Sequence, residues 1–598
     1  METTLTYTEL QLDTSLIVPD EFEQIRQLIE SYRAGGVESE AFRRFRLQNG
    51  IYGIRGETDV HMVRIKVPFG RLVARQLEGL ADILETYSDG RGHLTTRQDV
   101  QLYWVPIQRM PDLLADLGQV GLTTREACGN VVRNVTADPL AGVSPDEFFD
   151  VRPHANAVAR FLLRNPLSQN LPRKFKIAFS GSPADRAATA MHDIGALAAI
   201  EQEGDRRVRG FKIYVGGGLG SSPRSAALLE PFTPESKLLP TVEAIIRVYD
   251  RLGNRQNRAK ARIKFLVEQM GADPFRKLVL KEREILPLLK PQPYPEFSEI
   301  AEQIGWSAPL PPEQRPSDPG HENGVDPQKY TRWLSGNVIH QKQAGFASVQ
   351  IAVPGGDLYV DQFRGLAQIA RRFSQGELFT TISQNLVLRW VAEADLHAVY
   401  LALREIGLNE SGAHRLWNVT GCPGADTCNL AITTSHQLTM ALSARLRDSM
   451  ADLGFADDLK DVDIKISGCP NSCGQHHIAA IGFYGGARRV NGVQTPHYMM
   501  LLGGRVYNGQ ADFGKQVASI PAKHIPEAIQ RVIGLYRDGR NPGESFHTWL
   551  ERVGPLSLKE RFEDLRNLPE PASAPALYQD WGQDFPFKLQ TGEGECAI

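Results

Sequence analysis

Four of the six cysteines in this chain of 598 residues lie in two short motifs in its last third. Cys422 and Cys428 belong to GCPGADTC, and Cys469 and Cys473 belong to SGCPNSC. Two thiolate pairs at this spacing favour one polynuclear metal centre, most plausibly an iron–sulfur cluster. A structural zinc site and two disulfides are the alternatives. Both fit less well, because zinc pairs usually keep about two to four residues between ligands, and disulfides are not expected without a secretory segment.

A second group of candidates is a set of basic residues in the first half of the chain that could bind an anion. The set consists of Arg64, Arg97, Arg133, Arg173, Lys174 and Lys176, the last three within the segment PRKFK. In an extended segment Lys174 and Lys176 share one face, so that both could point at one ligand. For any single member, a position on the hydrated surface is the alternative.

Both groups lie in a pattern of elements that occurs twice. Residues 63–105 predict a strand, an amphipathic helix and a strand, and the same pattern returns about 286 residues later. The match continues from VRNVTADP at residue 132 to LWNVTGCP at residue 416, and from FSGSP at 179 to ISGCP at 466. A long internal duplication predicts two similar halves related by a pseudo-twofold axis, with a site between them.

The differences between the two copies divide the chemistry. Cys422 occupies the place of Asp138, whereas Arg133 corresponds to Trp417. One copy therefore supplies the metal ligands and the other supplies the positive charge. This division predicts an anionic ligand held between the copies.

Length and composition restrict the class of protein. A chain of this length predicts several domains. The formal net charge of −3, with 42% hydrophobic and 23% charged residues, is typical of a globular protein and argues against nucleic-acid binding. The N-terminus lacks the order of a signal or transit peptide, and no apolar run reaches about 18 residues. We therefore expect a cytoplasmic protein without a membrane span.

The two cysteine motifs, PRKFK, VRNVT and the duplication together resemble the assimilatory sulfite and nitrite reductases that carry sirohaem and a 4Fe–4S cluster. The resemblance covers about residues 50–550. It implies that Cys422, Cys428, Cys469 and Cys473 bind the cluster, and that Cys473 is also the proximal ligand of the sirohaem iron. It places Arg64, Arg133, Lys174 and Lys176 around the substrate. It implies contacts with sirohaem for Arg97 and Gln101, with Asn134, Arg173 and Asn418 adding to that shell.

The resemblance implies six-electron reduction of sulfite to sulfide in sulfur assimilation, with reduction of nitrite to ammonia as the alternative. Relatives that prefer nitrite have asparagine at the position of Lys176, so PRKFK favours sulfite. No P-loop, dinucleotide fingerprint or flavin-binding domain is indicated, so a separate ferredoxin or flavoprotein reductase would supply the electrons. The other classes are a zinc-stabilised scaffold and a non-enzymatic iron–sulfur or haem protein, which would not need an anion pocket.

The two remaining cysteines have less certain roles. Some relatives join a cysteine and a tyrosine covalently beside the sirohaem, and Cys128 and Tyr52 are candidates for such a link. A free apolar cysteine is the alternative for Cys128. Cys596 is expected to be an ordinary thiol of the C-terminal tail.

These observations predict an α+β fold in three lobes. The two ferredoxin-like repeat segments combine in one lobe, and each half adds an αβ lobe, with the cofactors between them. The expected divisions are an N-terminal extension 1–55, a ferredoxin-like half-domain 56–125, a sirohaem and substrate domain 126–285, an extended proline-rich linker 286–335, a second half-domain 336–408, a cluster and sirohaem domain 409–550 and a C-terminal tail 551–598.

Overall fold

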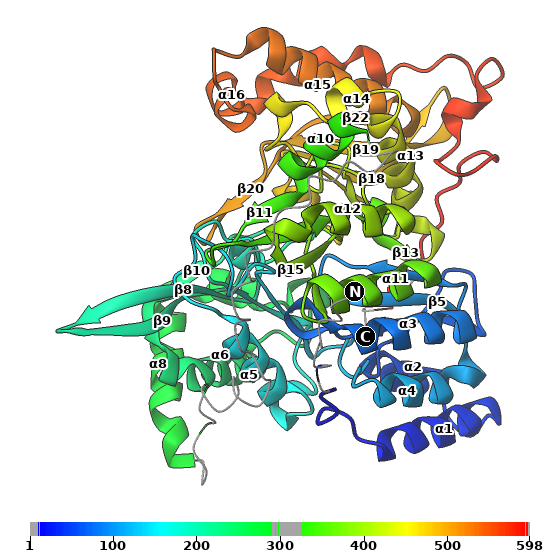
Figure 1. Cartoon of the computed structure of the whole chain (residues 1–598). Helices are drawn as coiled ribbons and strands as arrows, with labels where there is room; N and C mark the ends of the chain where they lie inside the picture. The colour runs from blue at the N-terminus through cyan, green and yellow to red at the C-terminus, as the bar shows by residue number, and fades with distance from the viewer. Residues whose placement is uncertain are drawn as a thin grey trace, which may run out of the picture.

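The computed structural model describes residues 10, 12–289, 294, 297, 326–592, 594 and 595. In this part of the chain the strands form four five-stranded sheets and one two-stranded ribbon (Figure 1). Each repeat of the sequence supplies one ferredoxin-like sheet and one αβ sheet. No helix in the described ranges is long and apolar enough to cross a membrane.

The two ferredoxin-like repeats combine in one lobe by exchanging a strand. The first sheet has the order β1, β2, β5, β4, β13, and the second has the order β11, β12, β15, β14, β3. Strand β13 thus leaves the second repeat to pair with β4, and β3 leaves the first repeat to pair with β14. The strands are β1 (Ile51–Gly53), β2 (Val60–Ile65), β3 (Arg71–Val73), β4 (Arg91–Leu94), β5 (Val100–Pro106), β11 (Val338–His340), β12 (Phe346–Ile351), β13 (Asp357–Tyr359), β14 (Glu377–Thr380) and β15 (Leu386–Ala392).

Helices α3 (Ala74–Tyr87) and α11 (Val360–Phe373) pack side by side in this lobe (Figure 1). Each follows an exchanged strand, and a glutamine in its first turn, Gln76 or Gln362, accepts a hydrogen bond from the backbone N–H just before the helix. Apolar residues of both repeats are fully buried in one shared core. Burial of this core holds the repeats together.

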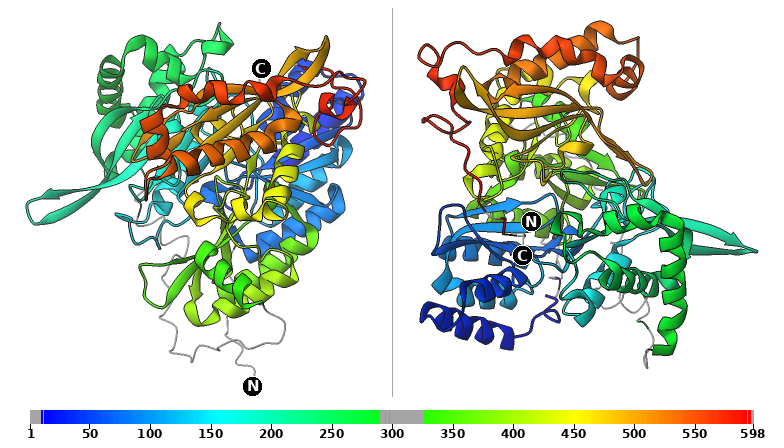
Figure 2. Two further views of the ribbon diagram at one scale, coloured as in Figure 1. Left: turned by 90° about the horizontal axis from the view of Figure 1, so that it is seen from above. Right: turned by 180° about the vertical axis from the view of Figure 1, so that it is seen from behind.

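Each repeat continues into a sheet whose first three strands are parallel and whose last three are antiparallel. The strands are β6 (Val132–Ala137), β7 (Phe175–Ser180), β8 (Ile194–Glu203), β9 (Arg206–Val215) and β10 (Ala227–Pro234) in the first copy, and β16 (Thr420–Gly421), β17 (Ile464–Ser467), β18 (Ile481–Val490), β19 (Val493–Leu502) and β22 (Lys515–Pro521) in the second. Helices α6 (Leu238–Leu252) and α15 (Ile525–Gly539) follow the last strands, and each αβ lobe has its own core. The β8–β9 hairpin projects from the body of the molecule (Figure 2).

Two equivalent glutamines, Gln98 and Gln384, join the lobes. Both have a left-handed φ of 61°. The buried Gln98 amide donates to the carbonyls of Thr380 (2.8 Å) and Ala137 (3.0 Å) and accepts from the Ala137 N–H (3.0 Å). The Gln384 amide donates to the carbonyl of Leu94 at 2.9 Å, and its own carbonyl accepts from the Gly421 N–H in the first cysteine motif. Each glutamine therefore links the ferredoxin-like sheet of the other repeat to the αβ sheet of the repeat to which the glutamine belongs.

The structure confirms the α+β fold and the internal duplication. The proline-rich segment 286–335, expected to be extended, is helical at both ends. Helix α8 (Ala272–Leu289) continues into it because Leu286 is buried in the core. Helix α10 (Pro327–Asn337) begins there because Asp326 caps its first N–H groups and proline suits the first helical position. Most of the segment, and Cys596, lie outside the described residues, and the remaining domain boundaries stay predictions.

The glutamine bonds predict a large effect of Gln98→Met on stability. The substitution keeps the size of the side chain but leaves three buried backbone groups unpaired, so we expect a loss of about 3 kcal/mol or more in the free energy of unfolding. Urea denaturation of this variant and of Gln202→Met, at the exposed end of the β8 hairpin strand, provides the measurement and the control. Equal midpoints for both variants and the parent protein would contradict the prediction.

Candidate cofactor and substrate site

The two cysteine motifs meet because their strands are parallel neighbours. Strand β16 leads into Cys422 and β17 leads towards Cys469, with Gly421 opposite Ile466. The N–H of Gly468 donates to the Cys422 Sγ at 3.2 Å. Glycines allow this contact, since a Cβ at Gly468 would lie 3.0 Å from the Cα of Gly424 in the other motif, and Gly424 has a φ of +67°.

The arrangement of the thiols argues against zinc and against disulfides. All five described cysteines are free thiols. Among the described residues, no three of the motif sulfurs lie within 4.8 Å of one another. Sulfurs around one tetrahedral zinc ion lie about 3.8 Å apart, given a Zn–S bond of about 2.3 Å. The wider spacing fits a polynuclear cluster.

The electrostatics of the thiols also fit a cationic metal centre. Burial, together with the neighbouring Cys473 and Cys422, raises the pKa of Cys428 to about 12. Burial and the same two neighbours raise the pKa of Cys469. The side chains of Cys428 and Cys473 are exposed, whereas those of Cys422 and Cys469 are buried. Iron ions bound by the four sulfurs would offset the mutual repulsion of the thiolates.

The first repeat contacts the second cysteine motif directly. The Thr96 hydroxyl donates to the carbonyl of Cys473 at 2.8 Å, and the Gln475 amide donates to the carbonyl of Thr96 at 3.3 Å. Thr96 lies in the same loop as Arg97 and Gln98. The loop that carries a predicted sirohaem contact is therefore fixed to the loop that carries the predicted sirohaem ligand.

The basic residues of the first copy gather on the same side as Cys473. Burial lowers the pKa of Lys176 on β7, the charges of Arg97 and Lys174 lower it further, and Cys473 opposes this effect. Burial lowers the pKa of Arg97 to about 10, with further contributions from Arg133 and Arg64. The predicted cations and the predicted metal ligands thus lie within electrostatic range of one another. Among these cations, Arg173 and Lys174 are partly buried just before β7.

The residues predicted to contact sirohaem are mostly buried and already hydrogen-bonded. The Arg97 guanidinium donates to Nε2 of His192 at 2.5 Å and to the carbonyl of Asn134. The Asn134 side chain uses its donors on two backbone carbonyls, which leaves only its oxygen free within the described chain. Gln101 donates to the sulfur of Met62. Asn418 exchanges hydrogen bonds with Asn385.

Arg64 and Arg133 enclose the pair of residues considered for a covalent link. The guanidinium of Arg64 lies 5.1 Å from the centroid of the Tyr52 ring. Arg133 donates to the Tyr52 hydroxyl at 3.3 Å and lies 3.9 Å from the Cys128 sulfur. Tyr52 and Cys128 pack in one small buried cluster. Their proximity fits the proposed link without testing it.

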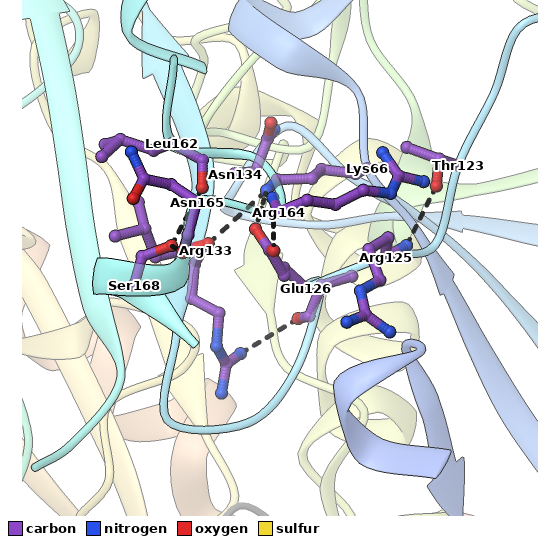
Figure 3. A network of polar contacts seen from close by, with 12 residues as sticks. Lys66, Thr123, Arg125, Glu126, Arg133, Asn134, Leu162, Arg164, Asn165 and Ser168 are labelled. Carbon is purple, nitrogen blue, oxygen red and sulfur yellow. Dashed lines mark hydrogen bonds and ion pairs between the residues drawn. The ribbon is translucent and has the colours of Figure 1, made fainter. Parts of the chain in front are cut away.

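A buried ion pair that was not predicted from the sequence lies behind Arg133 (Figure 3). The Lys66 ammonium lies 3.8 Å from Glu126, and the two side chains are 5% and 0% exposed. Glu126 has a left-handed φ of 62° and accepts from the backbone N–H of Arg164. Because a φ angle cannot be seen in a sequence, no pattern indicated this pair.

A second missed pair supports Lys176. Arg262 and Asp193 form a buried bidentate ion pair at 2.7 and 2.8 Å. The same Asp193 carboxylate accepts from the backbone N–H of Lys176 at 2.8 Å. The pair joins residues 69 positions apart, so no local pattern could have indicated it. It fixes β7 at the position of the lysine.

A cleft of about 640 Å³ lies beside residues 129–131, the segment that precedes β6 and its Arg133. Arg44, Arg255 and Arg258 give its lining positive charge, and Glu595 adds one negative side chain. Positive clefts concentrate anions. This cleft is therefore a candidate approach for an anion to the basic residues.

Comparison with known families identifies the class of protein. A family model described as "Nitrite and sulphite reductase 4Fe-4S domain" matches residues 128–285 and 412–567. A second, described as "Nitrite/Sulfite reductase ferredoxin-like half domain", matches residues 53–120 and 339–406. The chain belongs to the nitrite and sulfite reductase family. It is an oxidoreductase whose family implies sirohaem and a 4Fe–4S cluster as cofactors.

Individual relatives carry both activities in their names. The chain is 27% identical to the assimilatory ferredoxin-dependent nitrite reductase of Haloferax mediterranei, over 94% of this chain and 95% of the relative. It is 27% identical to sulfite reductase [ferredoxin] 1 of Mycolicibacterium paratuberculosis, over 84% of each. It is 30% identical to the ferredoxin–nitrite reductase of Synechococcus elongatus, over 79% of this chain and 85% of the relative. The solved NirA protein of Mycobacterium tuberculosis has the same fold, with a TM-score of 0.73 at 24% identity, over 91% of this chain and 97% of that one.

The four-cysteine cage predicts that Cys428→Ser prevents stable assembly of the cluster. A serine hydroxyl is a harder and more weakly bound ligand than a thiolate, so we expect most acid-labile sulfide to be lost. The matched control is Cys128→Ser, which removes a buried thiol from the other copy. Sulfide analysis of both purified variants is the measurement. Parental sulfide content in Cys428→Ser would refute the assignment.

Proposed function

We propose that the chain reduces sulfite to sulfide in sulfur assimilation. The observation that carries this proposal is the position of Lys176, whose ammonium lies within electrostatic range of Arg97 and of Cys473. Sulfite has one oxygen more than nitrite and can carry a second negative charge. An additional cation beside the substrate therefore stabilises sulfite more than nitrite.

The cations can divide the work of binding and protonation. Arg64 and Arg133 would hold the substrate oxygens, because a guanidinium stays charged and donates in a fixed geometry. Lys174 and Lys176 would deliver protons, since a lysine whose pKa is lowered, as that of Lys176 is, releases its proton more readily. When bound, the sirohaem and the cluster supply the redox chemistry.

The buried charge of Arg97 supports an anionic cofactor beside it. Its guanidinium hydrogen-bonds only to neutral groups within the described chain, among them His192 and Asn134. Asp99 and Asp193 act on its charge from nearby, yet burial still lowers its pKa to about 10, so a buried anionic ligand would stabilise the cation further. The carboxylates of sirohaem would do so. Gln101, Asn134, Arg173 and Asn418 are proposed to complete this shell, and Cys422, Cys428, Cys469 and Cys473 to bind the cluster, with Cys473 also the proximal ligand of the sirohaem iron.

Reduction of nitrite to ammonia is the second candidate function. Relatives named for either substrate are equally similar to this chain, at 27 to 30% identity. A smaller anion could use the same cations. The choice between the two activities therefore depends on Lys176.

We further propose that a separate ferredoxin supplies the electrons, with a flavoprotein reductase as the alternative donor. The printed names of several relatives include ferredoxin. The free thiols suit a reducing compartment, so the proposed location is the cytoplasm.

The role of Lys176 predicts a change of preference in Lys176→Asn. Asparagine keeps a hydrogen-bond donor but removes the charge, so the ratio of kcat/KM for sulfite to that for nitrite should fall about tenfold, equivalent to about 1.4 kcal/mol. Steady-state rates with reduced methyl viologen avoid any dependence on the donor protein. Lys281→Asn, at an exposed position of α8, is the control. An unchanged ratio would remove the argument for sulfite, and a parent enzyme with a far larger kcat/KM for nitrite would overturn it.

The contacts of Tyr52 and Cys128 predict a covalent link between them in the mature protein. Formation of a thioether bond replaces the S–H bond of Cys128 and a ring C–H bond of Tyr52 with a C–S bond, and a two-electron oxidant such as dioxygen accepts the two hydrogen atoms. The intact mass should therefore be lower than the sequence mass by two hydrogen atoms. Peptide mapping should recover the two residues in one cross-linked peptide. The Cys128→Ser variant should have its full calculated mass. A full calculated mass for the parent protein would exclude the link.

A further inference from the structure

An arginine of the first ferredoxin-like repeat contacts the first cysteine motif and is not among the residues of the reaction proposed above. Arg55 lies two residues after β1 and is partly buried. Its backbone N–H donates to the carbonyl of Thr427, next to Cys428, at 2.9 Å. A residue of the first repeat is therefore bonded to the loop that carries one of the predicted metal ligands.

The guanidinium of Arg55 is held by backbone carbonyls on both sides of Cys428. It donates to three carbonyls of the cysteine loop, those of Ala425 (3.3 Å), Asn429 (3.3 Å) and Ala431 (2.6 Å). It also donates to the carbonyl of Gln590 in the C-terminal tail at 2.7 Å. Because the donors of a guanidinium form a rigid planar fork, these four bonds fix the position of its charge.

The C-terminal tail is itself attached to the same loop. The N–H of Gly592 donates to the carbonyl of Asn429 at 2.9 Å. Three residues further on, the Glu595 carboxylate accepts from the guanidinium of Arg46 at 2.6 Å. The tail therefore keeps its Gln590 carbonyl in place beside Arg55.

The charge of Arg55 acts on both cysteine motifs. Burial lowers the pKa of Arg55, and the negative charges of Cys428, Asp426 and Cys469 oppose this effect. Within the described chain none of the side-chain hydrogen bonds of Arg55 goes to a carboxylate. The positive charge thus lies within electrostatic range of one thiol from each motif and is not hydrogen-bonded to an acid.

The other copy has an equivalent cation in the same backbone setting. Lys342 lies two residues after β11, the counterpart of β1, and its backbone N–H donates to the carbonyl of Val143 at 3.0 Å. Val143 lies five residues after Asp138, as Thr427 lies five residues after Cys422. The backbone bond of Arg55 is therefore repeated by Lys342.

The two cations differ in the partners of their side chains. The Lys342 ammonium forms an ion pair with Glu147 at 2.6 Å, and the Glu147 side chain is 1% exposed. Position 431, the equivalent of Glu147, is alanine, and Arg55 donates to its carbonyl instead. The copy without cysteines therefore neutralises its cation with a buried carboxylate, whereas the copy with cysteines has no acid at this place.

We propose that Arg55 is a positioning residue of the four-cysteine centre and that its fixed positive charge favours the reduced state, an inference that rests on the four cysteines binding an iron–sulfur cluster. A centre that takes up one electron from the donor protein gains one negative charge, and no proton or covalent bond changes. A cation held near Cys428 and Cys469 stabilises this added charge. Arg55 therefore raises the reduction potential of the centre.

The test is a redox titration of the cluster in the full-length protein at neutral pH, with dithionite as reductant, followed by electron paramagnetic resonance. In Arg55→Gln the ratio of reduced to oxidised cluster at a given potential should fall about tenfold, equivalent to a midpoint lower by about 59 mV. Arg55→Lys should keep most of the parent potential, because it keeps the charge. A purely structural role predicts no such rescue, since lysine lacks the planar fork that makes the four bonds.

Arg489→Gln is the matched control. Arg489 is exposed on β18 and also donates to a backbone carbonyl, that of Gly492 at 3.2 Å, so its loss should leave the potential at the parent value. Sulfide content and the visible spectrum show whether each variant holds its cluster, and Arg55→Met replaces Arg55→Gln if that variant does not.

The outcomes separate the role of Arg55 from the proposals on which it rests. The titration uses neither sulfite nor nitrite, so it does not depend on the choice between the two activities. A parent protein without acid-labile sulfide would refute the cluster itself. With the cluster present, an unchanged potential in Arg55→Gln, or equal shifts in Arg55→Gln and Arg55→Lys, would refute the role of Arg55 alone.

Discussion

The exchange of β3 and β13 between the two repeats is the constraint on which the rest of the structure depends. Each exchanged strand forms an ion pair with its new partner strand, but the sign of its charge differs. Arg71 on β3 pairs with Glu377, whereas Asp357 on β13 pairs with Arg91. Without the exchange, β3 would pair with β4 of its own repeat and place Arg71 beside Arg91. In the same way β13 would pair with β14 and place Asp357 beside Glu377. Like charges in these partly buried places oppose such pairing. Charge therefore selects the exchanged arrangement over two separate repeats.

The exchange also determines where the chemistry can lie. It fixes the Gln98 loop of the first repeat against the second and the Gln384 loop of the second against the first. The neighbouring Thr96 then reaches the Cys473 loop. Residues of both copies therefore meet at one place, where the predicted metal ligands come from one copy and the predicted cations from the other.

The sequence was sufficient for the parts of the molecule that repeat or that carry short motifs. The duplication predicted the α+β lobes, and the cysteine spacing predicted one metal centre, whose two motifs the parallel strands β16 and β17 bring together. Strand exchange could not be predicted, because β3 and β13 have three residues each and their partners lie far away in the sequence. The supporting ion pairs, such as Arg262 with Asp193, were missed for the same reason. The prediction of an extended proline-rich segment was wrong at its two ends. There, burial of Leu286 and capping by Asp326 stabilise helices that the amino-acid composition does not indicate.

The positive charge of the site has an energetic consequence for folding. Burial lowers the pKa values of Lys176, Lys66 and Arg97, so the charged form of each is less stable in the folded chain than in water. Carboxylates offset part of this cost, since Glu126 acts on Lys66 and both Asp99 and Asp193 act on Arg97. An anion that binds the folded state and not the unfolded chain stabilises the fold, and the stabilisation grows with the logarithm of its affinity. Binding of an anion by Arg97 and Lys176, as proposed above, would therefore also stabilise the fold.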